Sequence, residues 1–209
     1  MSKVIKILLL LFIAVMLIIT FVTGVSPLFA KLGGASDIDS VFGNYVEEGG
    51  YVEGEIHYTM GEFAEIVNII VIVPVGSEHY YLTFDEYMST YLVVRAEKGW
   101  EKNFADGISP DGVKVSGVAK SIPSDISLSL KSAIHEFNSE GFYPEATSVY
   151  IDCYAVQNAV MLLVGGVIAV ICTVMMLVSY KLYWRKPLAV SLMILVIDVL
   201  YMIVVMMKV

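Results

Sequence analysis

Long apolar runs at three places in the chain flank a segment in which polar and apolar positions alternate. The runs lie within residues 7–25, 155–180 and 188–207, and apart from thiols and phenols they hold one ionisable side chain, Asp198. A helix needs roughly 20 apolar residues to cross a bilayer, and in lipid it must pair its backbone polar groups internally. The pattern therefore predicts three transmembrane α-helices over these residues.

The segment between the first two runs has the pattern of an α+β domain. Polar and apolar residues alternate over residues 51–60, which is typical of a half-buried strand. Five more strands are predicted at residues 66–73, 80–84, 91–96, 113–119 and 147–154. Helices are predicted at residues 98–105 and from the N-cap Ser124 to Gly141. The expected fold is a small sheet or a partly closed OB-like barrel, with about six strands and two helices.

Charge is divided unevenly along the chain. Residues 23–154 hold 20 acids and 7 bases, a net charge of −13, whereas the remaining residues hold 6 bases and Asp198, a net charge of +5. Bases gather before the first run and in the short link between the second and third, and such bases favour the cytoplasmic side. The acidic domain is therefore predicted to be extracytoplasmic. Its charge also argues against nucleic acid as a partner.

Together these features predict a multi-pass protein of a bacterial cell membrane. The predicted parts are a cytoplasmic N-terminus (1–6), transmembrane helix 1 as an uncleaved signal anchor (7–25), a Gly-rich tether (26–50), the extracytoplasmic domain (51–154), transmembrane helix 2 (155–180), a basic cytoplasmic link (181–187), transmembrane helix 3 (188–207) and an external C-terminus (208–209). Cleavage of the first run as a signal peptide is the alternative, because a basic start followed by an apolar stretch is common to both.

Asp198 is the centre of the first candidate site. A charged acid in the middle of a membrane helix costs roughly 2.5–3.5 kcal/mol on insertion scales. We expect it to make a polar contact that joins helices 2 and 3 or binds a partner subunit, and a proton or cation relay is the alternative. The expected contact residues are Asp198, Ser191, Tyr201, Thr173 and Cys172, and the expected helix-packing residues are Gly165, Gly166 and Ala169.

A second candidate site is a metal site on the first strand of the domain. Glu53, Glu55 and His57 alternate along this strand, so they share one face and form a possible metal-ligand triad. A solvated strand face is the alternative. The sequence has no Gly-x-Ser-x-Gly element, no phosphate-binding glycine loop and no His-Glu-x-x-His pair. We therefore predict no catalytic activity and no cofactor.

Several β-patterned stretches of the domain carry a resemblance to known proteins. They are Gly50-Tyr51-Val52-Glu53-Gly54-Glu55-Ile56, Tyr80-Tyr81-Leu82 through Leu92-Val93-Val94-Arg95, and Val113-Lys114-Val115-Ser116-Gly117-Val118. The arrangement resembles bacterial three-span membrane proteins in which an extracytoplasmic domain of unknown function precedes a C-terminal helical hairpin. The resemblance implies no activity and assigns no functional residues.

The expected function follows from the architecture and from the absence of catalytic motifs. We predict a membrane-anchored extracytoplasmic protein for binding or complex assembly, without catalytic activity. Its expected partners are the lipid bilayer and either a membrane protein or a second copy, bound through helices 2 and 3. The alternative is an accessory subunit of a transporter or proton-coupled membrane system that uses Asp198.

Overall fold

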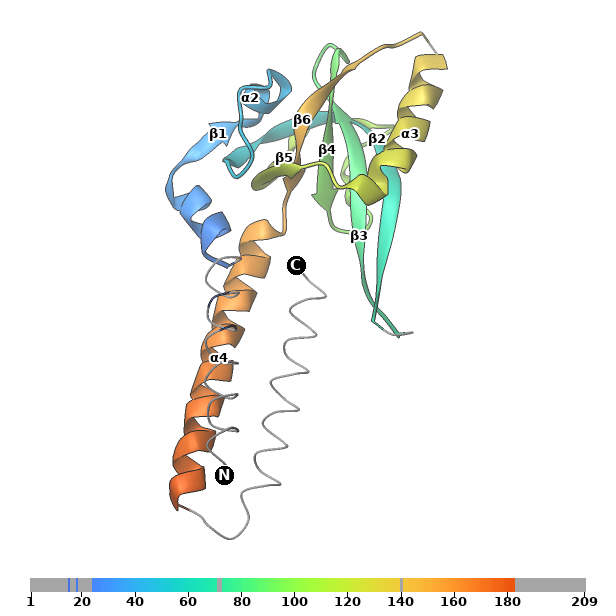
Figure 1. Ribbon diagram of the computed structural model, residues 1–209. Helices are drawn as coiled ribbons and strands as arrows, with labels where there is room; N and C mark the ends of the chain where they lie inside the picture. Colours follow the sequence, from blue (N-terminus) through green and yellow to red (C-terminus); the bar gives the residue numbers. More distant parts are fainter. Residues whose placement is uncertain (1–14, 16–17, 19–23, 71–72, 140, 183–209) are drawn as a thin grey trace. The chain divides into compact units, whose positions relative to one another are not determined.

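The computed structural model describes residues 15, 18, 24–70, 73–139 and 141–182 (Figure 1). The chain divides into two compact units, one made of residues 1–28 and 157–209 and the other of Phe29–Val156. The first unit contains most of helix α4 (Ala155–Leu182). The second unit contains the sheet and both candidate sites described below, so it is treated by itself.

The second unit has six strands and short helices. The strands are β1 (Ala35–Asp37), β2 (Tyr51–Ile70), β3 (Val73–Phe84), β4 (Thr90–Ala96), β5 (Ile108–Ser121) and β6 (Glu145–Asp152). The helices are α2 (Ile38–Phe42), α3 (Ser127–Ser139) and the 3₁₀ turns η1 (Trp100–Asn103) and η2 (Ser124–Ile126). The α+β class predicted for this part of the chain agrees with these elements.

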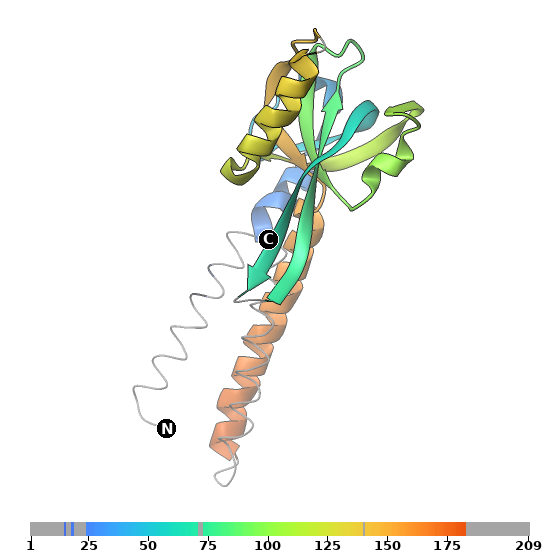
Figure 2. The same cartoon turned by 90° about the vertical axis from the view of Figure 1, so that its right-hand side faces the viewer.

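Five of the strands form a closed ring. The order is β1-β2-β3-β4-β6-β5, and a further pairing joins β5 back to β2. Within the ring β4 and β6 are parallel and the other neighbours are antiparallel, while β1 pairs in parallel with the start of β2. Strand β2 closes the ring because its first part pairs with β5 and its second part with β3 (Figure 2). The strand pairing is therefore that of the barrel alternative.

Apolar side chains fill the inside of the ring and also cover part of its outside. Tyr81, Val94 and Ile151 belong to the inner cluster, which draws on all five ring strands and on α2. Their sequence neighbours Tyr80, Val93 and Tyr150 belong to a second cluster, which includes Ile126, Leu130 and other residues of η2 and α3. Because β3, β4 and β6 are buried on both faces, their sequences are continuous apolar runs rather than alternating ones.

The prediction of a three-span membrane protein is wrong. Among the helices of the described residues, none combines the length and the apolar character that crossing a membrane requires. Two further predictions depended on those spans, the multi-pass cell-membrane localisation and the extracytoplasmic placement of residues 26–154. Both are therefore wrong as well. A long apolar run is necessary for a membrane-spanning helix but does not by itself show that one forms. Residues 188–207 and most of 7–25 lie outside the described part of the chain.

The segment predicted as a Gly-rich tether is folded instead. It contains β1 and α2, and its residues Ile38, Val41 and Val46 are buried in the inner cluster. Asp37 caps α2 by accepting a hydrogen bond from the amide of Asp39 at 3.1 Å. The glycines of this segment therefore mark turns between short elements.

The boundaries of two strands also differ from the prediction. The stretches 51–60 and 66–73 were predicted as separate strands, but β2 continues through both as far as Ile70. A register shift between Ile56 and Tyr58 precedes Thr59, which is buried although the alternation placed it with the exposed residues of the strand. A bulge adds a residue to one strand and so reverses the faces beyond it.

Candidate functional site

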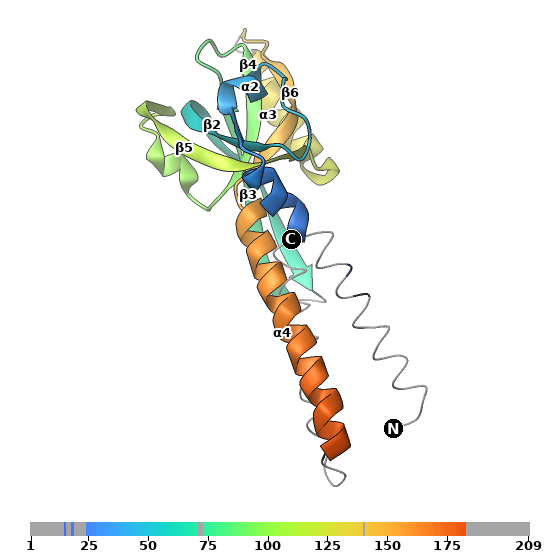
Figure 3. The ribbon, with the colours of Figure 1, turned by 90° about the vertical axis from the view of Figure 1, so that its left-hand side faces the viewer.

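An acid-lined groove is a candidate binding site on the second unit. It has a volume of about 690 Å³ and lies where β1 and α2 meet β2, the turn after β3 and the start of β5. Figure 3 shows α2 beside β2, with β5 next to β2. Five carboxylates line the groove, from Asp37, Asp39, Glu55, Asp85 and Glu86. The lining contains no lysine or arginine, so the groove favours a cationic ligand.

Local hydrogen bonds hold two of these carboxylates in place. Asp85 accepts from the amides of Ser89 and Thr90 at 2.7 and 2.9 Å and from the Ser89 hydroxyl at 2.6 Å. Asp37 is the N-cap of α2. Asp39, Glu55 and Glu86 form no ion pair within the described residues, so their charges are available to a ligand.

The predicted metal triad is divided between this groove and the neighbouring surface. Glu55 and His57 line the groove, whereas Glu53 lines a second depression, together with Glu55 and Lys114. His57 Nδ1 lies 3.0 Å from the carbonyl oxygen of Ser109, which can only accept, so Nδ1 carries a proton and donates it. The ligand atoms of the three residues are not among the close groups of possible metal ligands in the described chain.

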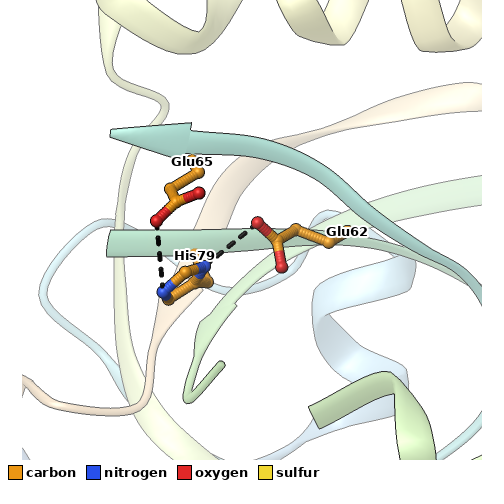
Figure 4. Close-up of side chains that lie close together, drawn as sticks. All are labelled: Glu62, Glu65 and His79. Atoms are coloured by element: carbon orange, nitrogen blue, oxygen red, sulfur yellow. Dashed lines mark hydrogen bonds and ion pairs between the residues drawn. The ribbon is translucent and has the colours of Figure 1, made fainter. Parts of the chain in front are cut away.

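A different histidine is surrounded by carboxylates. His79, which is 5% exposed, lies on β3 between Glu62 and Glu65 of β2 (Figure 4). Its Nδ1 is 3.0 Å from Glu62 Oε1, and its Nε2 is 2.8 Å from Ser77 Oγ and 3.9 Å from Glu65 Oε1. The ligand atoms of the two acids and the histidine all lie within 4.8 Å of one another. This arrangement meets the geometric requirement that Glu53, Glu55 and His57 do not.

Sequence reasoning missed this cluster because it depends on a bulge. In a regular strand Glu62 and Glu65, three residues apart, would point to opposite faces. A register shift between Glu62 and Ala64 puts an extra residue into β2, so both carboxylates reach the same side of the hairpin. The available signal was an isolated histidine, His79, directly before the predicted strand 80–84.

A row of alternating charges crosses four strands on the outside of the ring. Lys120 of β5 contacts Asp152 of β6 at 2.7 Å, Asp152 contacts Arg95 of β4 at 3.2 Å, and Arg95 contacts Glu78 of β3 at 3.1 Å. The side chain of Asp152 is fully buried and that of Arg95 is 7% exposed. Burial and the nearby Asp152 carboxylate raise the pKa of Tyr150. Because its two central side chains are buried and paired with each other, we regard this row as structural.

Cys153, next to this row, carries a partly buried thiol. Burial and the charge of Asp152 raise its pKa to about 12. The thiolate is the reactive form of cysteine. In a Cys172→Ser variant at pH 8, Cys153 should therefore react with a disulfide reagent about a hundredfold more slowly in the folded protein than in the unfolded protein. Release of the coloured thiol measures this rate. Ser132→Cys in a cysteine-free background provides an exposed thiol for comparison, and equal rates for the two positions would refute the expected protection.

The residues predicted around Asp198 lie mostly outside the described structure. Ser191, Asp198 and Tyr201 fall in the undescribed segment. Thr173, Cys172 and Ala169 belong to α4, but their side chains are outside the described part. Gly165 and Gly166 are buried residues of α4. The predicted polar contact and helix packing therefore stay predictions.

The acid-lined groove and the His79 cluster are consequently the two sites that the described residues form. Neither requires a residue outside the second unit. The sequence matches no protein-family model, and no curated protein and no solved structure is significantly similar to it.

Proposed function

We propose that the second unit is a non-catalytic binding module whose groove takes a basic segment of a partner protein during complex assembly. The single observation that carries this proposal is the groove with five carboxylates and no basic side chain in its lining. An extended chain carrying lysine or arginine side chains complements such a groove in charge, and charge complementarity increases both association rate and specificity.

The groove also offers apolar contact for the stems of such side chains. Phe42, Tyr58 and Ile108, which are partly or well exposed, are part of its lining. Lysine and arginine place apolar stems on such surfaces while their charged ends reach acids. A groove that combines apolar floor and acidic rim suits a basic peptide better than a free metal ion.

Binding of labelled octalysine to the full-length protein, measured by fluorescence anisotropy, tests the proposal. The variant Asp39→Asn/Glu55→Gln/Glu86→Gln removes three groove charges whose side chains form no hydrogen bond or ion pair within the described residues. We expect it to bind at least about tenfold more weakly, because each lost charge pair contributes up to about 1 kcal/mol. Binding of wild type should also weaken at high salt.

A second triple variant is the matched control. Asp111→Asn/Glu136→Gln/Glu145→Gln removes three exposed acids outside the groove and changes the net charge by the same amount. It should bind octalysine within twofold of wild type. If the two triple variants lose the same affinity, the acidic surface as a whole attracts the peptide and the groove is not the binding site.

A further inference from the structure

The His79 cluster supports an inference that is independent of the groove. We propose that His79 and Glu65 bind a divalent first-row transition-metal ion such as Zn²⁺, with Glu62 orienting the histidine from its other nitrogen. All three residues come from the β2–β3 hairpin, and the bulge at Glu62 brings them together.

The hydrogen bonds of His79 determine which nitrogen is available. The Glu62 carboxylate can only accept when ionised, so Nδ1, at 3.0 Å from it, carries the proton. Nε2 therefore presents its lone pair, which in the absence of a metal accepts the Ser77 hydroxyl at 2.8 Å. Histidines that bind metals usually donate their other ring N–H to a carboxylate in this way, which fixes the tautomer and increases ligand basicity.

The distance to the second acid fits a shared ion. Glu65 Oε1 lies 3.9 Å from Nε2. Neighbouring ligand atoms of a tetrahedral zinc lie about 3.4 Å apart, given metal–ligand distances of about 2.0–2.2 Å. A small rotation of Glu65, whose side chain is 39% exposed, is enough to close the difference. Water and the Ser77 hydroxyl are available for the remaining positions.

The charge of the cluster also favours a cation. Two carboxylates adjoin an imidazole that is 5% exposed, and no lysine or arginine of the described residues pairs with Glu62 or Glu65. A bound divalent ion compensates both charges. An imidazole ligand selects Zn²⁺, Cu²⁺ or Ni²⁺ over Ca²⁺ and Mg²⁺, which prefer sites made entirely of oxygen atoms.

The chain has only three histidines, so a complete histidine scan tests the site. Titration of metal-free full-length protein with ZnCl₂ at pH 7.5, followed by calorimetry, should give one site per chain. His79→Gln should weaken binding at least about a hundredfold. Glu65→Gln and Glu62→Gln should each weaken it about 10- to 100-fold, the range found when a group that orients a metal ligand is removed. Addition of excess Ca²⁺ should not displace the zinc.

His57→Gln and His135→Gln are the controls. His57 lines the acidic groove and His135 is exposed on α3, and both variants should bind zinc as wild type does. Because His79 is buried and its replacement can disturb the hairpin, the more exposed Glu65→Gln is the decisive variant, with circular dichroism to verify its fold.

Three results would overturn the inference. Wild type without saturable zinc binding, unchanged affinity in Glu65→Gln, or loss of binding in His57→Gln would each exclude this cluster as the metal site. Covalent labelling of Ser77 by a fluorophosphonate would instead assign Ser77, His79 and Glu62 to a nucleophile–base–carboxylate relay. None of these results depends on octalysine binding, so failure here is distinguishable from failure of the proposed function.

Discussion

Asp152→Ala is expected to lower the free energy of unfolding of the second unit by about 3 kcal/mol, the lower end of the range for breaking a buried ion pair. The carboxylate is fully buried and accepts from Arg95, from Lys120 and, through its other oxygen, from the amide of Tyr154 at 3.0 Å. Without it, the buried guanidinium of Arg95 keeps Glu78 as its only carboxylate partner. Part of the cost of burying that charge is then no longer compensated.

Urea unfolding followed by tryptophan fluorescence measures this loss. Trp100 is buried in the inner cluster, so a Trp184→Phe background makes it the single reporter. Asp111→Ala removes an exposed acid and should change stability by less than about 0.5 kcal/mol.

A double variant separates the loss of the Arg95–Asp152 ion pair from the cost of leaving a buried charge uncompensated. Replacing both partners, as in Arg95→Met/Asp152→Leu, should cost less than Asp152→Ala alone, because apolar residues of similar size leave no unpaired buried charge. If Asp152→Ala unfolds within about 0.5 kcal/mol of wild type, the row of alternating charges does not stabilise the ring.

Gly54→Ala should give the second large effect, a loss of about 2 kcal/mol, which is typical of an overpacked core. A Cβ atom at residue 54 would overlap the side chain of Ile38, coming within 2.7 Å of its Cβ. Ile38 is 2% exposed and begins α2, so relief of the overlap must move α2 away from β2. The same urea titration measures the loss.

Because Asp37 and Asp39 adjoin Ile38, the same variant should also alter the groove. Octalysine should therefore bind more weakly to Gly54→Ala than to wild type. Gly33→Ala is the matched control, since its added Cβ meets only carbonyl oxygens at 3.4 Å, and it should be nearly neutral. Equal stability of wild type and Gly54→Ala would mean that α2 does not pack on β2 as described.

Much of the domain could be predicted from periodicity. Strands β4 and β6 agree with the predicted runs to within a few residues, and a helical segment does begin at Ser124, although its N-cap is Pro123 and no side chain caps it. The strands combine high β-propensity with clear turn signals, which are local properties of the chain. The segment 26–50 was predicted incorrectly, because its short elements depend on burial against β2 and not on their own propensity.

The candidate sites were predicted less well. Glu53, Glu55 and His57 were predicted as a possible metal-ligand triad, whereas Glu55 and His57 line a groove together with carboxylates from β1, α2 and the turn after β3. Those elements are far apart in sequence, and no local pattern shows that they meet. The His79 cluster depends on the bulge at Glu62, which breaks the two-residue alternation on which sequence reasoning depends.

Periodicity and charge are properties of each segment alone, and they were enough to predict the α+β class of the second unit, most of its strands and its strongly acidic character. They were not enough to establish whether the apolar runs cross a membrane, and the prediction that they do was wrong. The closure of the ring through β2 and β5, the formation of the groove and the meeting of Glu62, Glu65 and His79 are visible only in the folded chain. Each of these depends on register and on contacts between distant segments, where a shift of one residue moves a side chain to the opposite face.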